Sequence, residues 1–176
     1  MFTRKHSLAA LCTLALAACA TVTDTPKLGK PVSAAELAAW DTSVMPDGAG
    51  LPAGRGTTAQ GARVYAEKCV ACHGENGKGG ISSALLPKPP ITSINAAEKG
   101  INNFWPYAST LFDYIRRAMP WQSPKTLTSD EVYALTAYLL ALNKVIPDGA
   151  TLDAASLAKV RMPNQDGFIL RFPDRI

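Results

Sequence analysis

Five consecutive residues, Cys69-Val70-Ala71-Cys72-His73, place two thiols and an imidazole within one short segment. Two intervening residues let a helical turn present both thiols to one edge of a flat cofactor, and the histidine that follows then lies under its centre. Thiols can add to the two vinyl groups of a porphyrin, and imidazole is a common ligand of its iron. The C-x-x-C-H pattern therefore predicts haem c bound covalently through Cys69 and Cys72, with His73 as the proximal iron ligand.

Three other kinds of site could use two cysteines at this spacing. A structural zinc site needs about four ligands, and the sequence contains no second Cys/His pair. A thioredoxin-like dithiol is expected in a βαβ context, and no strand-rich pattern surrounds these residues. A disulfide between Cys69 and Cys72 would leave His73 unexplained. Haem attachment accounts for all three side chains.

The N-terminal segment has the pattern of a bacterial secretion signal. Residues 4–6 are basic, and residues 8–18 form an apolar stretch too short to span a bilayer. The stretch ends in Leu16-Ala17-Ala18-Cys19, which resembles the lipobox of bacterial lipoproteins, where the cysteine is lipidated and becomes the new N-terminus. This resemblance implies a lipid anchor at Cys19 on the periplasmic side of a bacterial membrane. The alternative is an ordinary signal, cleaved after Ala20, that releases a soluble periplasmic protein.

Removal of residues 1–18 changes the charge of the chain. Of 18 Lys and Arg residues, Arg4 and Lys5 are lost, so 16 remain against 14 Asp and Glu residues, a formal charge of +2. Two haem propionates would bring this charge close to zero. The basic composition therefore gives no reason to expect a nucleic-acid partner.

The length of 176 residues suits one domain with flanking segments. We predict a lipoprotein signal peptide at residues 1–18, a tether at 19–31 and an N-terminal extension at 32–56. The haem-binding domain is expected at residues 57–143. Residues 144–176 are then a C-terminal extension that packs on this domain.

Apolar periodicity predicts three helices, at about residues 58–69, 110–118 and 129–142. In the first helix Gly61, Tyr65 and Cys69 fall on one face. The second is expected to be capped by Ser109 and stopped by Pro120. The last is expected to begin with a capping box made by Thr128 and Glu131.

This arrangement resembles the class I cytochromes c, an all-α fold in which a small helical bundle surrounds one covalently bound haem. In that family a glycine and an aromatic residue on the first helix meet a leucine and a tyrosine on the last. Gly61 and Tyr65 match the first pair, and Leu135 and Tyr138 match the second. The resemblance implies that these four residues form the helix crossing beside the haem.

The sixth iron ligand is expected to be a methionine. His73 is the one histidine left after signal removal, so a second histidine ligand within this sequence is excluded, and Met45, Met119 and Met162 remain. Class I cytochromes place the axial methionine on a loop before the last helix, where Met119 lies. The resemblance therefore implies Met119, with Met162, beyond the last predicted helix, as the alternative.

The same resemblance implies further contacts around the haem. In class I cytochromes a proline carbonyl after the haem motif accepts the free N–H of the proximal histidine. Pro87 is our first choice for this role, and Pro89 is the other candidate. Trp105 is expected either at the haem edge or as a core anchor for its loop.

A closer similarity covers roughly residues 30–170. The sequence resembles the cytochrome c subunit of Sox-type sulfite dehydrogenase, a partner of a molybdopterin enzyme of the sulfite oxidase family. The segments that carry this resemblance are Trp40-Asp41, Val44-Met45-Pro46-Asp47-Gly48, Gly50-Leu51-Pro52, Trp105-Pro106-Tyr107-Ala108, Phe112-Asp113-Tyr114-Ile115-Arg116-Arg117-Ala118-Met119-Pro120, Glu131-Val132-Tyr133-Ala134-Leu135-Thr136-Ala137-Tyr138 and Met162-Pro163-Asn164-Gln165-Asp166-Gly167-Phe168. Two departures are the single C-x-x-C-H, where members of that family often carry two haem domains, and the lipobox.

The resemblance implies a monohaem electron carrier rather than an enzyme. Its expected donor is a periplasmic dehydrogenase, molybdopterin-dependent and sulfite dehydrogenase-like, in a sulfur-oxidation pathway. Its expected acceptor is another cytochrome or a terminal oxidase. The alternatives are a catalytic haem subunit with a displaceable sixth ligand and a haem-based redox or ligand sensor.

Overall fold

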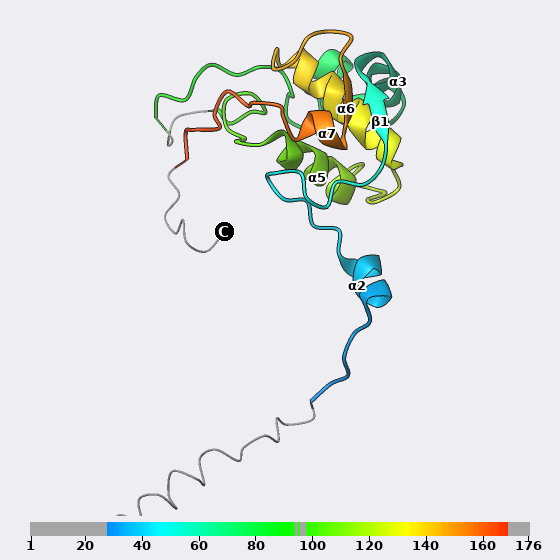
Figure 1. Cartoon of the computed structure of the whole chain (residues 1–176). Coiled ribbons are helices and arrows are strands. Elements are labelled where there is room, and N and C mark those ends of the chain that lie inside the picture. Colours follow the sequence, from blue (N-terminus) through cyan, green and yellow to red (C-terminus); the bar gives the residue numbers. More distant parts are fainter. Residues whose placement is uncertain (1–27, 94, 96–97, 169–176) are drawn as a thin grey trace, which may run out of the picture. The chain divides into compact units, whose positions relative to one another are not determined.

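The helices that carry the core are those with the strongest apolar periodicity. The computed structural model describes residues 28–93, 95 and 98–168, and in it α3 (Thr58–Lys68), α5 (Ala108–Ala118) and α6 (Ser129–Leu142) pack together (Figure 1). The predictions for the first and last of these helices are confirmed. α6 begins with the expected capping box, in which the Thr128 hydroxyl accepts the Glu131 N–H and the Glu131 carboxylate accepts the Thr128 N–H. The predicted all-α fold class is also confirmed.

α5 begins earlier than the sequence suggested. Its N-cap is Tyr107, which has extended backbone and makes no side-chain capping bond, so the prediction that Ser109 caps this helix is wrong. Ser109 lies inside the first turn and is buried. Tyr107 forms an isolated antiparallel bridge with Arg161, which lies more than fifty residues away in the sequence. A capping rule uses only neighbouring residues and therefore cannot take this contact into account.

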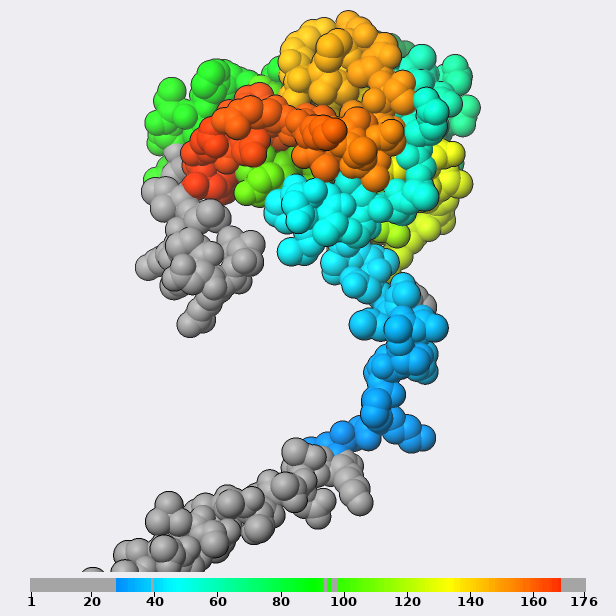
Figure 2. All heavy atoms as spheres, in the orientation of Figure 1, coloured from blue at the N-terminus to red at the C-terminus, as the bar shows by residue number. Residues whose placement is uncertain are grey.

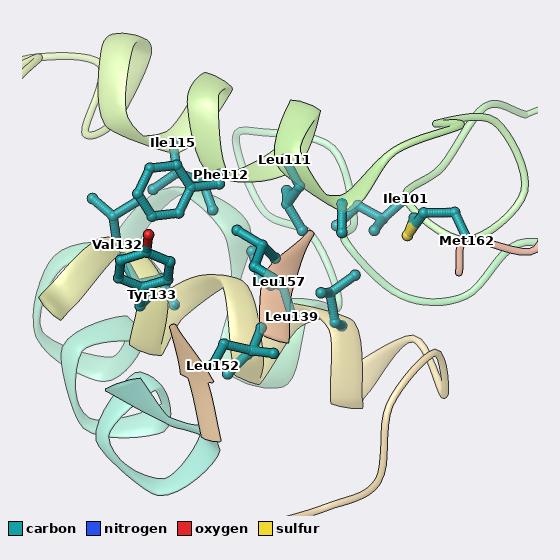
Figure 3. Packing of buried hydrophobic residues seen from close by; sticks show 14 of the residues in the cluster. Ile101, Leu111, Phe112, Ile115, Val132, Tyr133, Leu139, Leu152, Leu157 and Met162 are labelled. Carbon is teal, nitrogen blue, oxygen red and sulfur yellow. The ribbon is translucent and has the colours of Figure 1, made fainter. Parts of the chain in front are cut away.

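The core lies between α5 and α6. Phe112 and Tyr133 face each other with ring centroids 4.5 Å apart, both fully buried, and the Tyr133 hydroxyl donates to the Pro52 carbonyl at 2.8 Å. Figure 3 shows these rings beside Ile115, and Met162 beside Ile101 at the other end of the same cluster. Aromatic pairs in this geometry add to the stability that their buried area already supplies.

A short antiparallel sheet joins the segment before α3 to the segment after α6 within one compact unit, Thr42–Ile176. β1 (Arg55–Thr57) pairs with β2 (Thr151–Asp153), with Gly56 opposite Leu152. β2 leads directly into α7 (Ala154–Leu157), whose Leu157 is buried. Figure 2 shows the orange-to-red segment after β2 lying over one face of the unit. Residues 151–168 thus add a strand, a short helix and buried side chains to the helical core.

Two further short helices surround the C-x-x-C-H motif. α4 (Val70–His73) follows α3 directly, and η1 (Glu75–Gly77) follows α4. Another helix, α2 (Ala34–Trp40), begins with a capping box formed by Ser33 and Glu36. The chain divides into two units, Met1–Asp41 with α2 and Thr42–Ile176 with all the other elements.

Several predictions are not tested by the structure. Cys19 and the apolar stretch before it lie outside the described residues, so the signal peptide and lipid anchor stay predictions. The domain boundaries at residues 18, 31, 56 and 143 also stay predictions. No helix within residues 28–93 and 98–168 is long and apolar enough to cross a membrane.

An ion pair between α3 and α6 gives a pH-dependent prediction. Lys68 donates to the Glu131 carboxylate, and this bond, more than any other contact, holds the pKa of Glu131 below its ordinary value. A lowered pKa means that the stabilisation is present above the ordinary carboxyl pKa and is lost as the pH falls through the lowered value.

Glu131→Gln should therefore reduce the free energy of unfolding by about 0.5–1 kcal/mol at neutral pH, because both side chains are partly exposed. The difference from wild type should shrink as the pH falls through the lowered pKa of Glu131 and vanish once the carboxyl is protonated in both the folded and the unfolded protein. Chemical denaturation at neutral pH and at a series of acidic pH values measures this. An equal loss of stability at neutral and at acidic pH would mean that the pair contributes through side-chain packing and not through charge.

Candidate functional site

The C-x-x-C-H residues are placed by the junction of α3 and α4. Cys69 ends α3, with its N–H donating to the Tyr65 carbonyl, and its own carbonyl accepts the N–H groups of Cys72 and His73 at 3.1 and 3.0 Å. This single turn puts both sulfur atoms and the imidazole on one cavity. Both cysteines are partly buried, and no disulfide joins them.

The cavity beside this turn has a volume of about 520 Å³, within the usual range for ligand sites. Its remaining walls are mostly apolar and come from α5, α6 and the loops between the helices. They include Leu85, Ile101, Trp105, Leu111, Leu135 and Leu139. A large apolar macrocycle needs such walls, with thiols at one edge and an iron ligand on a face. The residues present therefore fit a haem.

The proximal histidine is held by a backbone carbonyl, although not by the one that was predicted. Nδ1 of His73 lies 3.0 Å from the carbonyl oxygen of Ser83, so the choice of Pro87 is wrong. Since a carbonyl oxygen only accepts, Nδ1 carries the proton and Nε2 keeps its lone pair for a metal. The chain turns back after α4 through bonds from Gly79 N–H to the His73 carbonyl and from Ser82 N–H to the Cys72 carbonyl, which brings Ser83 to the ring before Pro87 is reached.

The two methionine candidates are in different environments. Met119 ends α5, donates its N–H to the Ile115 carbonyl at 3.1 Å, and lines the cavity that contains Cys69, Cys72 and His73. Met162 is buried in the hydrophobic core near Ile101 (Figure 3) and is not among the residues that line this cavity. The geometry thus brings Met119, and not Met162, to the site.

The predicted crossing residues lie where α3 meets α6. A Cβ placed on Gly61 would be 2.0 Å from the Ala134 carbonyl oxygen and 2.6 Å from the Tyr138 Cβ, so only glycine allows this approach. The rings of Tyr65 and Tyr138 lie 5.2 Å apart. Leu135, which lies in α6 like Tyr138, lines the cavity.

Tyr65 also supports the segment after the motif. Its hydroxyl donates to the Gly74 carbonyl at 3.0 Å, and burial raises the pKa of this phenol to about 12. The hydroxyl therefore stays protonated and remains a donor across the physiological pH range. Trp105 lines the cavity and packs edge-on against Tyr114, with ring centroids 5.6 Å apart.

The environment of Cys69 disfavours a redox dithiol. Burial raises the pKa of its thiol to about 11, whereas the attacking cysteine of a disulfide oxidoreductase has a lowered pKa. Within the described residues, no three His, Cys, Asp or Glu side chains gather as a metal cluster, so the zinc interpretation gains no support there.

Two residues that hold the motif were not found from the sequence. Ser83 acts through its carbonyl, and every residue carries a carbonyl, so its type gave no signal. Asn143 lies at the end of α6, and its side-chain amide donates to the Leu85 carbonyl at a distance of 2.8 Å. A buried asparagine just after an apolar helix was the signal available for it.

The chain is similar to known proteins over the segment that contains this site. Residues 56–139 match the family described as cytochrome c oxidase, cbb3-type, subunit III. The chain is 37% identical to a chain in the crystal structure of the sulfane dehydrogenase SoxCD from Paracoccus pantotrophus, with a TM-score of 0.73 over 86% of this chain and 73% of that one.

A second relative is the thiosulfate dehydrogenase of Stutzerimonas stutzeri (strain A1501), which is 25% identical over 111 residues. The match covers 63% of this chain but only 35% of that relative, so the chain spans about a third of its length. Together with the fold and the cavity, these similarities show that the chain belongs to the cytochrome c family, as a class I electron-transfer cytochrome whose domain binds haem c covalently.

Proposed function

We propose that this chain is a monohaem electron carrier, with haem bound through Cys69 and Cys72 and its iron held by His73 and Met119. The observation that carries this proposal is the cavity on which both thiols, the imidazole and the thioether come together. Bound haem c supplies a one-electron Fe(III)/Fe(II) couple. The single C-x-x-C-H in the sequence supports one haem.

The side chains around the cavity suit a carrier that does not bind substrate at iron. The Ser83 carbonyl orients His73, and the apolar walls keep water away from the cofactor. A thioether ligand raises the reduction potential relative to histidine and occupies the position that a small molecule would need. Among the described residues that line the cavity, His73 is the only histidine.

We propose a sulfur-compound dehydrogenase of the molybdopterin, sulfite dehydrogenase-like class as the electron donor, and another cytochrome or a terminal oxidase as the acceptor. The similarity to a chain of the sulfane dehydrogenase SoxCD supports this donor class. The similarity to a thiosulfate dehydrogenase favours a second candidate, a haem subunit that oxidises a sulfur compound itself.

One experiment separates carrier from catalyst. The oxidised holoprotein is mixed with sulfite or thiosulfate, alone and with a purified molybdopterin sulfite dehydrogenase, and haem reduction is followed by absorbance. A carrier is reduced only when the dehydrogenase is present. Reduction by thiosulfate alone, or ready binding of carbon monoxide to the reduced form, would replace the carrier proposal with the catalytic one.

We propose a location on the periplasmic side of a bacterial membrane, with Cys19 as the lipid anchor. Leu16-Ala17-Ala18-Cys19 supports this proposal. Cys19→Ser should move the haem-loaded protein from the detergent-soluble membrane fraction to the soluble periplasmic fraction, because the nucleophile for lipidation is lost. Mass spectrometry of the wild-type N-terminus gives an independent check, and a wild-type protein that begins at Thr21 would instead indicate an ordinary signal.

A further inference from the structure

The carbonyl that holds His73 belongs to a loop that hydrogen bonds attach on both sides of Ser83. We call residues 74–85 the proximal loop. The part before Ser83 is fixed to the haem motif, because Gly79 N–H donates to the His73 carbonyl at 2.7 Å and Ser82 N–H donates to the Cys72 carbonyl at 2.9 Å. Its far end is fixed at Leu85, two residues after Ser83. The position of the Ser83 carbonyl therefore depends on both attachments, the bond from Ser82 before it and the bonds that hold Leu85 after it.

Leu85 is held through both of its backbone groups. Its N–H donates to the Gly77 carbonyl at 2.8 Å, within the loop itself. Its carbonyl accepts a hydrogen from Nδ2 of Asn143 at 2.8 Å, and the same amide nitrogen donates to the Leu139 carbonyl at 2.9 Å. Asn143 thus ties the proximal loop to the last turn of α6.

The surroundings of Asn143 indicate that its side-chain N–H donors, and not its oxygen, favour an asparagine at this position. The residue is only 4% exposed, and its Oδ1 is buried with no hydrogen-bond partner within the described part of the chain. A buried amide oxygen without a partner is unfavourable, and a leucine of similar size would avoid that cost. The opposite orientation of the amide would set its oxygen against two carbonyl oxygens, so the arrangement of Nδ2 and Oδ1 is fixed by the network.

We propose that Asn143 is a positioning residue: by holding the Leu85 carbonyl, it keeps the Ser83 carbonyl on the His73 ring and so lowers the reduction potential of the bound haem. This inference rests on the proposed ligation of iron by His73. A stronger hydrogen bond from Nδ1–H makes the imidazole a better electron donor, which stabilises the ferric form more than the ferrous form. Loosening the loop weakens that bond and raises the potential.

Asn143→Leu tests this, because it removes both donors and the unpaired oxygen while keeping the same number of heavy atoms and the same branching at Cγ. In the reduced holoprotein, NMR should show the His73 ring proton exchanging with solvent about tenfold faster than in wild type. At a fixed ambient potential the ratio of reduced to oxidised protein should rise about threefold, which is about 28 mV at 59 mV per tenfold change.

Asn103→Leu is the matched control. Asn103 is also buried, and its Nδ2 donates to two carbonyls, those of Pro89 and Glu98, at 2.7 and 2.9 Å, away from the proximal loop. It should lower the unfolding midpoint and leave the His73 ring proton and the potential unchanged. Equal shifts in both variants, or none with Asn143→Leu, would overturn the proposal.

The wild-type protein supplies a measurement that needs no variant. If the two sites open together, the Asn143 side-chain amide and the His73 ring proton should be slowed by similar factors relative to their intrinsic exchange rates, and a ring proton that is protected much less than the amide contradicts the proposal. Failure of the proposed function looks different, because wild-type protein would then lack haem or lack a low-spin histidine–methionine spectrum before any variant is compared.

Discussion

Met119→Ala should remove the weak long-wavelength absorption band that methionine ligation gives to ferric haem c, while the haem stays covalently attached. Met119 lines the same cavity as Cys69, Cys72 and His73, and α5 ends at this residue with its N–H on the Ile115 carbonyl. Alanine keeps that backbone bond but carries no sulfur. The iron would then be left with an open or water-filled position, and the reduced protein should bind carbon monoxide readily.

Met162→Ala is the control for this prediction. Met162 is 1% exposed within the core, so its truncation should lower the free energy of unfolding by about 2–5 kcal/mol. The absorption band should survive in whatever protein remains folded. Met162→Leu, which conserves volume, should cost less than about 1.5 kcal/mol and keep the band. Loss of the band with either Met162 variant, and its survival in Met119→Ala, would exchange the two assignments.

The haem-facing residues divide into those that sequence can identify and those that it cannot. Cys69, Cys72 and His73 form a motif because side-chain chemistry demands those residue types at that spacing. Met119 could be chosen over Met162 only through the family resemblance, since a thioether serves equally well as core filling. Ser83 and Asn143 act through a carbonyl and a long-range amide bond, and neither leaves a local pattern.

The fold divides in the same way. α3 and α6 were predicted closely because apolar periodicity and, for α6, a capping box are local properties of the chain. β1 and β2 were not predicted, because strands of three residues carry too little alternation to be recognised and they pair across more than ninety residues. The early start of α5 likewise depends on the contact between Tyr107 and Arg161. The sheet and the start of α5 thus depend on non-local contacts, whereas α2 and α7, which were also missed, begin with local capping boxes but are only 7 and 4 residues long.

The approach of α3 to α6 is the packing feature on which the site most depends, because α3 ends at the cysteines. Gly61 lies against the Ala134 backbone, and Gly56 in β1 lies against the same residue, where an added Cβ would be 2.3 Å from the Ala134 nitrogen. At Gly61 the obstacles to a Cβ are a backbone carbonyl and the Tyr138 Cβ, neither of which is the free end of a flexible side chain. The helices would have to move apart to admit one.

Gly61→Ala therefore sets two effects of opposite sign against each other. Alanine is the better helix former by about 1 kcal/mol, which alone would stabilise the protein. Overpacking a fixed contact costs about 1–3 kcal/mol and sometimes more, and a contact at 2.0 Å with a backbone oxygen belongs at the upper end. We expect a net loss of about 2 kcal/mol or more, a lower unfolding midpoint of the holoprotein and less haem-loaded protein, with Gly61→Val worse still.

Ala66→Gly in the same helix calibrates the propensity effect in this experiment. Ala66 is exposed, so this change should cost only about 1 kcal/mol and leave haem loading intact. If Gly61→Ala were as stable as wild type or more stable, the gain in helix propensity would outweigh any overpacking. That result would contradict the close contact between Gly61 and Ala134. Helix propensity alone predicts that Gly61→Ala raises the free energy of unfolding. A decrease larger than the one caused by Ala66→Gly would therefore show that Gly61 is needed for the helix crossing.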